Sequence, residues 1–214
     1  MKYELQNVIS GKGEVIHGNP IQAVASYLKR STGASKLVKE SEFFRKQETE
    51  ILIEYITAND LWVKEIKVEN YVSQGAEQKV YLKDGKSVLK LNDAIFYASW
   101  TDYFHNLLLN NFFFPDTAYE LLGFYKEENI VYSVVKQPFV KATEQTDLEL
   151  VRKFMAENGF LNTRNNDYHN PDLGIILEDL HDENVLTENG ILQFIDTVFY
   201  VTDVFYENKC DEQI

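Results

Sequence analysis

The chain has 214 residues, of which 44% are hydrophobic and 14% aromatic, so it can bury a substantial core. Its 34 acidic and 21 basic residues give a net charge of −13, which opposes general binding to nucleic acid or to anionic membrane surfaces. The single cysteine, Cys210, excludes an intrachain disulfide. No apolar run approaches the roughly 20 residues of a membrane span, and the N-terminus has no apolar signal region, so we expect a cytoplasmic protein.

Residues 1–60 predict a helical leader. Asn19-Pro20 is a typical helix start, with Asn as the cap and Pro in the first turn. An apolar face follows, and Gly33 is the expected end of this helix. A second helix is expected from about Glu42 to about Ala58, where apolar residues recur on one side.

The hydrophobic period changes after Leu61 from that of helices to that of strands. Asp84-Gly85 is typical of a tight hairpin between two strands. After the third strand, Asn92 or Asp93 is expected to cap an aromatic-rich helix that runs to about Asn110. In all we expect five antiparallel strands, near residues 61–71, 78–82, 87–91, 119–125 and 130–137.

The last third of the sequence predicts smaller elements. Thr146 or Asp147 is expected to cap a helix that runs to about Glu157. Residues 162–172 are polar and predict a loop, and Asn189-Gly190 is typical of the turn of a short hairpin.

A segment rich in carboxylates, residues 178–186, stands between two apolar runs. Polar groups held between buried strand pieces are costly unless they have partners or a function. Further along, Asp196 closes a second apolar run and is expected at the rim of a cleft, where it could hold a metal ion.

Phosphoryl transfer from a nucleotide requires a cation on the phosphates, a carboxylate that orients the acceptor, a lysine that neutralises phosphate and a close backbone turn. Mg²⁺ prefers carboxylate and amide oxygens. The sequence offers Asn184 and Asp196 for the metal, Asp179 for the acceptor, Lys90 for phosphate, and a turn at Gly75.

The string D-L-H-D-E-N-V-L at 179–186, followed by F-I-D at 194–196, resembles the catalytic and metal-binding loops of the protein-kinase-like superfamily. It is nearest to the active site of the aminoglycoside phosphotransferases. S-V-L-K at 87–90 resembles the lysine motif of the third strand, and G-A-E-Q-K-V-Y at 75–81 resembles a reduced glycine-rich loop. V-V-K-Q-P-F-V at 134–140 resembles the hinge at which adenine pairs with the backbone.

The arrangement as a whole is similar to the kinase-like domain of polyvalent proteins from bacteria, phages and mobile elements. This resemblance implies an α+β, protein-kinase-like, two-lobed fold. We expect a helical leader at 1–60, an N-lobe at 61–140 with a five-stranded antiparallel sheet plus one helix, and a reduced C-lobe at 141–214 that carries the catalytic and metal loops.

The resemblance also implies roles for single residues. Asp179 matches the catalytic base, and Asn184 and Asp196 match the two ligands of Mg²⁺. Lys90 matches the lysine that pairs with the phosphates of ATP, and Gly75 matches one glycine of the phosphate loop.

Two further residues are implied near the nucleotide. Gln137 lies in the hinge motif and is expected to contact the cofactor. Residues 93–110 contain no Glu, so Asp102 is the only well-placed acid to pair with Lys90. The expected activity is ATP- and Mg²⁺-dependent phosphoryl transfer to a protein or small-molecule acceptor, in an effector of a phage or mobile element.

Two alternatives remain open at this point. A kinase-like fold can bind nucleotide, or only a protein, without turnover. The pair His181-Asp182, with His169, Asp172 and Asp196, also matches the ligand types of a His-Asp metal phosphohydrolase, although such ligands are usually presented from helices.

Overall fold

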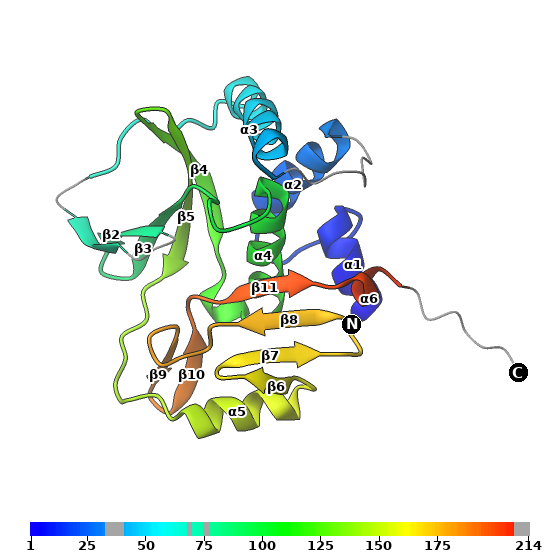
Figure 1. The fold of residues 1–214 in the computed structure, drawn as a ribbon. Helices are drawn as coiled ribbons and strands as arrows, with labels where there is room; N and C mark the ends of the chain where they lie inside the picture. Colours follow the sequence, from blue (N-terminus) through cyan, green and yellow to red (C-terminus); the bar gives the residue numbers. More distant parts are fainter. Residues whose placement is uncertain (33–40, 68–69, 75–77, 208–214) are drawn as a thin grey trace, which may run out of the picture. The chain divides into compact units, whose positions relative to one another are not determined.

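The computed structural model describes residues 1–32, 41–67, 70–74 and 78–207 (Figure 1). The chain separates into two compact units. Unit 1 comprises Met1–Gln6 and Lys141–Ile214, and unit 2 comprises Asn7–Val140.

Unit 2 is built on an antiparallel sheet of five strands, as the sequence predicts. The strands are β1 (Tyr71–Gln74), β2 (Gln78–Asp84), β3 (Ser87–Asn92), β4 (Glu120–Glu127) and β5 (Ile130–Pro138). They lie in the order β1-β2-β3-β5-β4, so the hairpin β2–β3 joins the hairpin β4–β5 through β3 and β5.

The first expected strand is wrong in extent. β1 begins only at Tyr71, and of the described residues before it only Trp62 forms a strand-like bridge, to Phe124 of β4. The close approach of this segment to β4 requires Gly123, because a Cβ there would lie 2.4 Å from the carbonyl oxygen of Leu61. Residues 61–67 therefore form an extended strap along β4 rather than a full strand.

The two faces of the sheet carry different side chains. On one face Leu91, Tyr132 and Val134 form a small apolar cluster with Ile66 of the strap. Lys90 precedes Leu91 along β3 and therefore projects from the opposite face, because successive residues of a strand alternate between faces.

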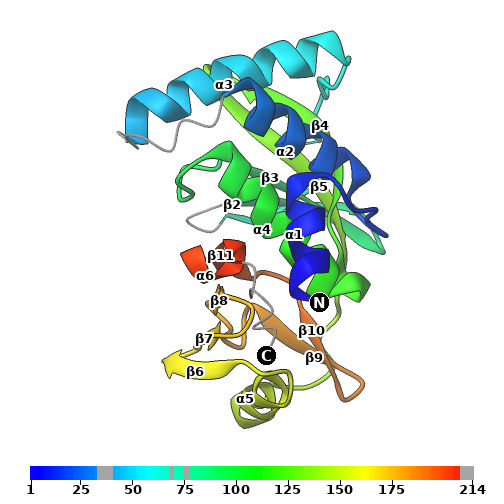
Figure 2. The ribbon, with the colours of Figure 1, turned by 90° about the vertical axis from the view of Figure 1, so that its right-hand side faces the viewer.

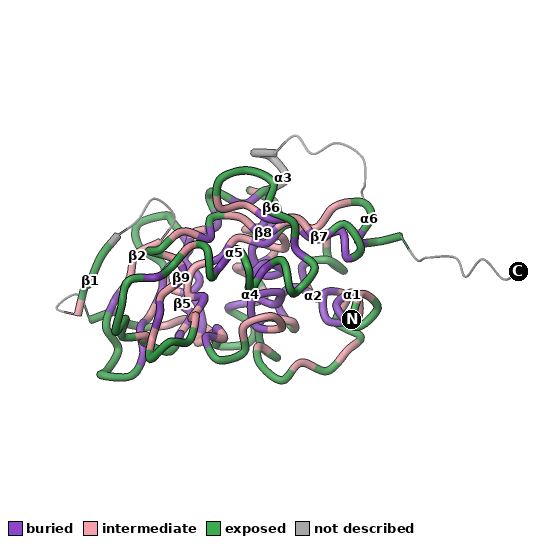
Figure 3. The backbone as a smooth tube through the Cα atoms, turned by 90° about the horizontal axis from the view of Figure 1, so that it is seen from below, coloured by how far each residue is buried: buried purple, intermediate pink, exposed green. Residues whose placement is uncertain are grey.

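A helix covers that opposite face. In α4 (Trp100–Phe113), the Tyr103 hydroxyl lies 2.6 Å from the Ser133 hydroxyl of β5. Most residues of α4 are buried, and its backbone is largely purple in Figure 3. Two further helices, α2 (Asn19–Ser31) and α3 (Ser41–Ala58), pack against α4 and against each other (Figure 2).

The starts of two helices differ from the predictions. Asn19 is the first helical residue of α2 rather than its cap, and Gly18 at φ 92° occupies the cap position without a side-chain hydrogen bond. The cap of α4 lies six or seven residues later than expected, at Ser99 rather than at Asn92 or Asp93. Those two side chains instead accept hydrogen bonds from backbone N–H groups two residues on, and Ser99 is the cap of α4.

Unit 1 contains a four-stranded antiparallel sheet and a separate hairpin (Figure 1). The sheet has the order β11-β8-β7-β6, with β6 (Leu161–Arg164), β7 (Asp167–Asn170), β8 (Ile175–Glu178) and β11 (Val198–Val201). The hairpin consists of β9 (Val185–Glu188) and β10 (Ile191–Phe194). The helices are α5 (Leu148–Glu157), the start of α1 (Lys2–Ser10) and the single turn α6 (Asp203–Tyr206).

Predictions for this unit have mixed outcomes. Asp147 caps α5, and the turn at Asn189-Gly190 joins β9 to β10, both as expected. The loop predicted at 162–172 is wrong, because most of it forms the hairpin β6–β7. All four residues of β6 are exposed. The strand therefore lacks the alternating apolar residues by which a strand is predicted from sequence.

No helix among the described residues is long and apolar enough to cross a membrane.

A buried histidine makes the stability of unit 2 depend on pH. His105 of α4 is 7% exposed, and burial lowers its pKa to about 4 from the usual 6.5, with Lys29 acting in the same direction and Asp102 against it. The unfolded chain binds this proton below about pH 6.5, and the folded protein only below about pH 4. Lowering the pH across this interval should therefore destabilise the fold by ~3 kcal/mol through His105.

The measurement is urea unfolding of the wild type and of His105→Gln at several pH values between 7 and 4. Other titrating groups cancel in the difference between the two proteins. We expect the variant to gain stability relative to the wild type as the pH falls, and parallel curves would contradict the assignment.

Candidate functional site

The predicted catalytic residue lies directly after a buried strand. Asp179 follows β8 and adopts the left-handed backbone conformation, with φ 69°, which Asp tolerates better than most side chains. Its backbone N–H donates to Asp167 Oδ1 at 3.1 Å, so β7 supports the turn. The Asp179 carboxylate is 57% exposed and is therefore accessible from solvent.

Asn184 stabilises this turn through its side chain. Its Nδ2 donates to the Asp179 carbonyl at 2.9 Å and to the Asp179 carboxylate at 2.8 Å. Asp179 Oδ1 also lies 3.2 Å from His181 Nε2, which braces the same carboxylate. Because the amide nitrogen points to Asp179, the amide oxygen of Asn184 is left over, and no described residue donates a hydrogen bond to it.

The second predicted metal ligand lies next to the first. The backbone carbonyl of Asn184 accepts hydrogen bonds from Ile195 N at 2.9 Å and Asp196 N at 3.4 Å. The hairpin β9–β10 brings its two ends together in this way, with Asn184 before β9 and Asp196 after β10. The structure thus brings Asn184 into contact with both Asp179 and Asp196, although the three residues are spread over 18 positions.

Negative charge accumulates around this cluster. Burial raises the pKa of Glu178, and the carboxylates of Asp167 and Asp179 raise it further. A cation near these groups would be attracted by the same field. The donors at Asn184 and Asp196 are oxygens, which suits a hard divalent cation such as Mg²⁺.

The hydrolase alternative finds no support in the same region. Within the described ranges, no three His, Cys, Asp or Glu side chains are grouped closely enough to hold a metal ion. His169 lies on β7, and His181 turns its ring toward Asp179.

Lys90 is positioned by an aromatic ring of unit 2. Its side chain is buried, and its ammonium lies 5.4 Å from the centre of the Tyr119 ring, within the range of a cation–π interaction. Asn111 of α4 holds the backbone of Tyr119 from both sides, accepting from Tyr119 N at 2.7 Å and donating to Tyr119 O at 2.8 Å. α4 therefore fixes the ring on which Lys90 rests.

The other predicted cofactor residues have different surroundings. Gln137 is buried in β5, shares a face of the sheet with Lys90, and donates from Nε2 to Thr117 O at 2.9 Å. Asp102 accepts a hydrogen bond from Ser99 Oγ at 2.8 Å in the cap of α4, so its pairing with Lys90 stays a prediction. Gly75 lies outside the described residues.

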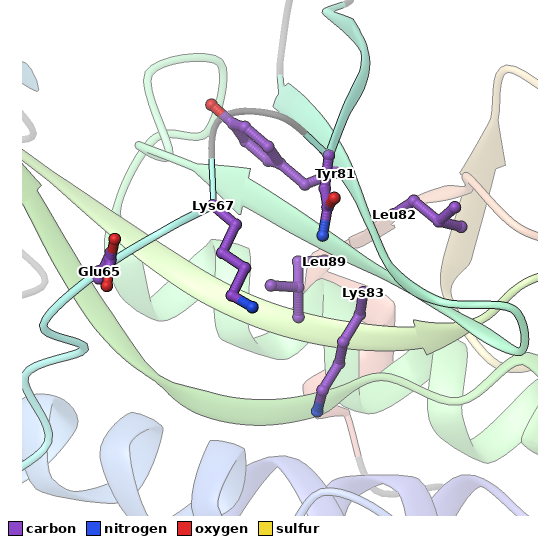
Figure 4. A pocket seen from close by; sticks show the side chains of 7 residues that line it. Glu65, Lys67, Tyr81, Leu82, Lys83 and Leu89 are labelled. Atoms are coloured by element: carbon purple, nitrogen blue, oxygen red, sulfur yellow. The ribbon is translucent and has the colours of Figure 1, made fainter.

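A shallow pocket lies on the opposite face of the sheet from Lys90. Figure 4 shows the side chains of Lys67 and Lys83 on either side of Leu89 in this pocket. Leu89 and Lys90 are neighbours on β3 and project from opposite faces. The pocket is therefore separate from the predicted phosphate-binding lysine.

Sequence reasoning missed two supporting residues. Asp167 holds the backbone of Asp179 from a hairpin that the sequence presents as a polar loop. Tyr119 precedes β4 and contacts Lys90 from 29 positions away, and no local pattern distinguishes it from the many other aromatic residues. No sequence signal indicates Asp167, because the polar segment that contains it predicts a loop.

Comparison with known proteins identifies a family. The model of a family described as serine/threonine/tyrosine kinases found in polyvalent proteins matches residues 45–203, which is well over half of the chain. No curated protein and no solved structure matches the chain.

The contact between Lys90 and Tyr119 can be measured by a double-mutant cycle. We expect Lys90→Met and Tyr119→Leu to be coupled by roughly 1–2 kcal/mol in unfolding free energy, because a desolvated cation over a ring is attracted more strongly than an exposed one. Urea unfolding of the wild type, both single variants and the double variant gives this value.

A second cation–π pair in the same sheet provides the control. Lys79 lies 4.8 Å from the ring of Tyr132, but its ammonium also pairs with Glu127 and is partly exposed. Lys79→Met and Tyr132→Leu should therefore couple more weakly, by about 0.5 kcal/mol. A coupling free energy of zero between Lys90 and Tyr119 would show that the ring does not hold the lysine.

Proposed function

Because the chain belongs to the family of serine/threonine/tyrosine kinases found in polyvalent proteins, we propose that it transfers the γ-phosphate of ATP to an acceptor hydroxyl with the help of Mg²⁺. The observation that carries this proposal is the arrangement around Asn184. One side chain steadies the Asp179 carboxylate, and the backbone of the same residue holds Asp196 beside it. Such an arrangement suits a catalytic carboxylate next to a cation.

The metal would be held by Asn184 and Asp196. The amide nitrogen of Asn184 is engaged by Asp179, which leaves its amide oxygen for the metal, and Asp196 is half-buried just after β10. When bound, Mg²⁺ would neutralise the charge that develops on the β- and γ-phosphates. Lys90, in unit 2, would bind phosphate oxygens through its ammonium.

Asp179 would orient the acceptor. In the proposed step the acceptor oxygen forms a bond to the γ-phosphorus while the bond from that phosphorus to the β–γ bridging oxygen breaks. ADP leaves with that electron pair, and the proton of the hydroxyl passes to the Asp179 carboxylate. The exposed carboxylate is accessible to such a hydroxyl, and its contacts with Asn184 and His181 limit its rotation.

We assign the parts of the chain accordingly. Residues 61–140 would form the lobe that binds nucleotide, with adenine near Gln137 and phosphate near Gly75. Residues 141–214 would form the reduced lobe with the catalytic and metal loops, and residues 1–60 a helical leader. The acceptor would be a protein or a small molecule, and the resemblance of the sequence to polyvalent proteins implies an effector encoded by a phage or mobile element.

Nucleotide binding is tested by thermal denaturation of the full chain with increasing Mg-ATP. Saturating ligand at ~100 times its dissociation constant should stabilise the fold by about 2.7 kcal/mol, a rise of roughly 5–10 °C in Tm for a protein of this size. The non-hydrolysable analogue with an imido bridge should act similarly if hydrolysis is not needed.

Two substitutions in unit 1 give the matched comparison. Asp196→Asn removes a proposed metal ligand and should abolish most of the shift. Asp182→Asn removes an exposed carboxylate of the same region and should keep it. A wild type without a shift would leave no nucleotide-dependent function, whereas an Asp196→Asn variant with the full shift would refute the metal assignment alone.

A further inference from the structure

A carboxylate from helix α3 is buried at the start of helix α4. Glu48 has no solvent exposure, and its Oε2 accepts from Trp100 N at 2.6 Å. Its Oε1 accepts from Thr101 N at 3.1 Å and from the Thr101 hydroxyl at 2.6 Å. One side chain of α3 thus satisfies three donors in the first turn of α4, where the helix dipole also favours negative charge.

An arginine on the same side of α3 holds the loop before α4. Arg45 precedes Glu48 by three residues, so the two side chains project from one face of the helix. The Arg45 guanidinium donates to the carbonyls of Ala94, Ile95 and Tyr97. Ala94 has φ 58°, a left-handed conformation that costs free energy for a residue with a Cβ, and it persists here because its surroundings hold it.

These contacts exceed what α4 needs in order to begin. Ser99 already caps the helix, because its hydroxyl accepts from Asp102 N at 3.0 Å and donates to the Asp102 carboxylate. Burying the additional charge of Glu48 is costly, and this cost appears as a raised pKa of its carboxyl. What the contacts of Arg45 and Glu48 add is a fixed placement of α4 and of the preceding loop against α3.

The placement of α4 reaches Lys90 by two routes. Near the start of the helix, the Tyr103 hydroxyl is hydrogen-bonded to Ser133 Oγ. Ser133 Oγ in turn donates at 3.2 Å to the carbonyl of Asn92, which lies two residues after Lys90 on β3. Near its end, Asn111 holds Tyr119, whose ring lies against the Lys90 ammonium. A shift of α4 would therefore move the ring and the strand that carry Lys90.

We infer that Arg45 and Glu48 are positioning residues for nucleotide binding: they hold α4 where Lys90 is correctly placed for phosphate. The inference rests on the proposed function, since it assumes that Lys90 engages ATP. The inference assigns to α3 a role beyond packing. Arg45 and Glu48 would influence the affinity for nucleotide indirectly, because they act on Lys90 through α4.

The test compares Mg-ADP affinity by calorimetry, at a temperature at which all proteins are folded. Glu48→Gln replaces one accepting oxygen by a donor and should weaken Mg-ADP binding at least tenfold. Glu50→Gln alters an exposed carboxylate of the same helix and should bind as the wild type does. Ile56→Val, a buried change in α3, controls for a loss of stability without loss of these contacts.

A milder pair keeps the test decisive if Glu48→Gln does not fold. Thr101→Ala removes only the hydroxyl that donates to Glu48 and should weaken binding about threefold, while Thr101→Ser should restore it. Equal affinity of the wild type, Glu48→Gln and Thr101→Ala would overturn the inference and leave the proposed function standing. Absence of Mg-ADP binding by the wild type would overturn both, and a loss shared by Ile56→Val would show that the role is only structural.

Discussion

The burial of helix α4 on most of its surface is the constraint on which the architecture of unit 2 depends. A polar group inside a protein must find a partner, because leaving it unsatisfied costs more than the hydrogen bond returns. Several such groups of α4 are paired, and their partners come from different segments of unit 2. The pairs are the first turn of α4 with Glu48, Tyr103 with Ser133, Asn106 with Tyr97, and Asn111 with Tyr119.

These pairs explain why helix α3, the sheet and the loops of unit 2 pack tightly around α4. Apolar contacts alone would allow α4 to slide or rotate, since they are not directional. Hydrogen bonds to fixed backbone groups allow one placement. These contacts also fix the position of Lys90. Asn111 holds the ring of Tyr119 that Lys90 contacts, and Ser133 links α4 to β3, the strand that carries Lys90.

The cluster in unit 1 is stabilised differently. The Asp179 carboxylate is exposed, so its order cannot come from burial. It comes instead from hydrogen bonds within a short turn, to Asn184 and Asp167, and from the proximity of His181. The buried strands on either side of the turn anchor its ends.

Much of this could be predicted from the sequence where a residue's neighbours along the chain determine its structure. The hairpin turns and most strands of unit 2 follow from alternation and from turn residues, and the D-L-H string indicates the cluster at Asp179. The predicted start of α4 was wrong because the side chains of Asn92 and Asp93 can accept hydrogen bonds from backbone N–H groups in a turn as well as in a helix cap. The propensity of a residue to cap does not decide between these two uses.

Long-range partners could not be predicted. Glu48 lies 52 positions before Trp100, and in the sequence it is one of several acidic residues on a helix whose apolar face is wide. Tyr119 is similarly one aromatic residue among many. Only the packed structure shows that Glu48 contacts the first turn of α4 and that the ring of Tyr119 lies against Lys90.

The central claim is that Asp179 acts in phosphoryl transfer, and the most direct measurement is transfer of labelled γ-phosphate from Mg-ATP by the full chain, to itself or to water. We predict that the wild type transfers the label and that Asp179→Asn binds Mg-ADP with unchanged affinity but transfers at least ~10²-fold more slowly, as expected for loss of a catalytic base. An Asp179→Asn variant that transfers at the rate of the wild type would contradict the account.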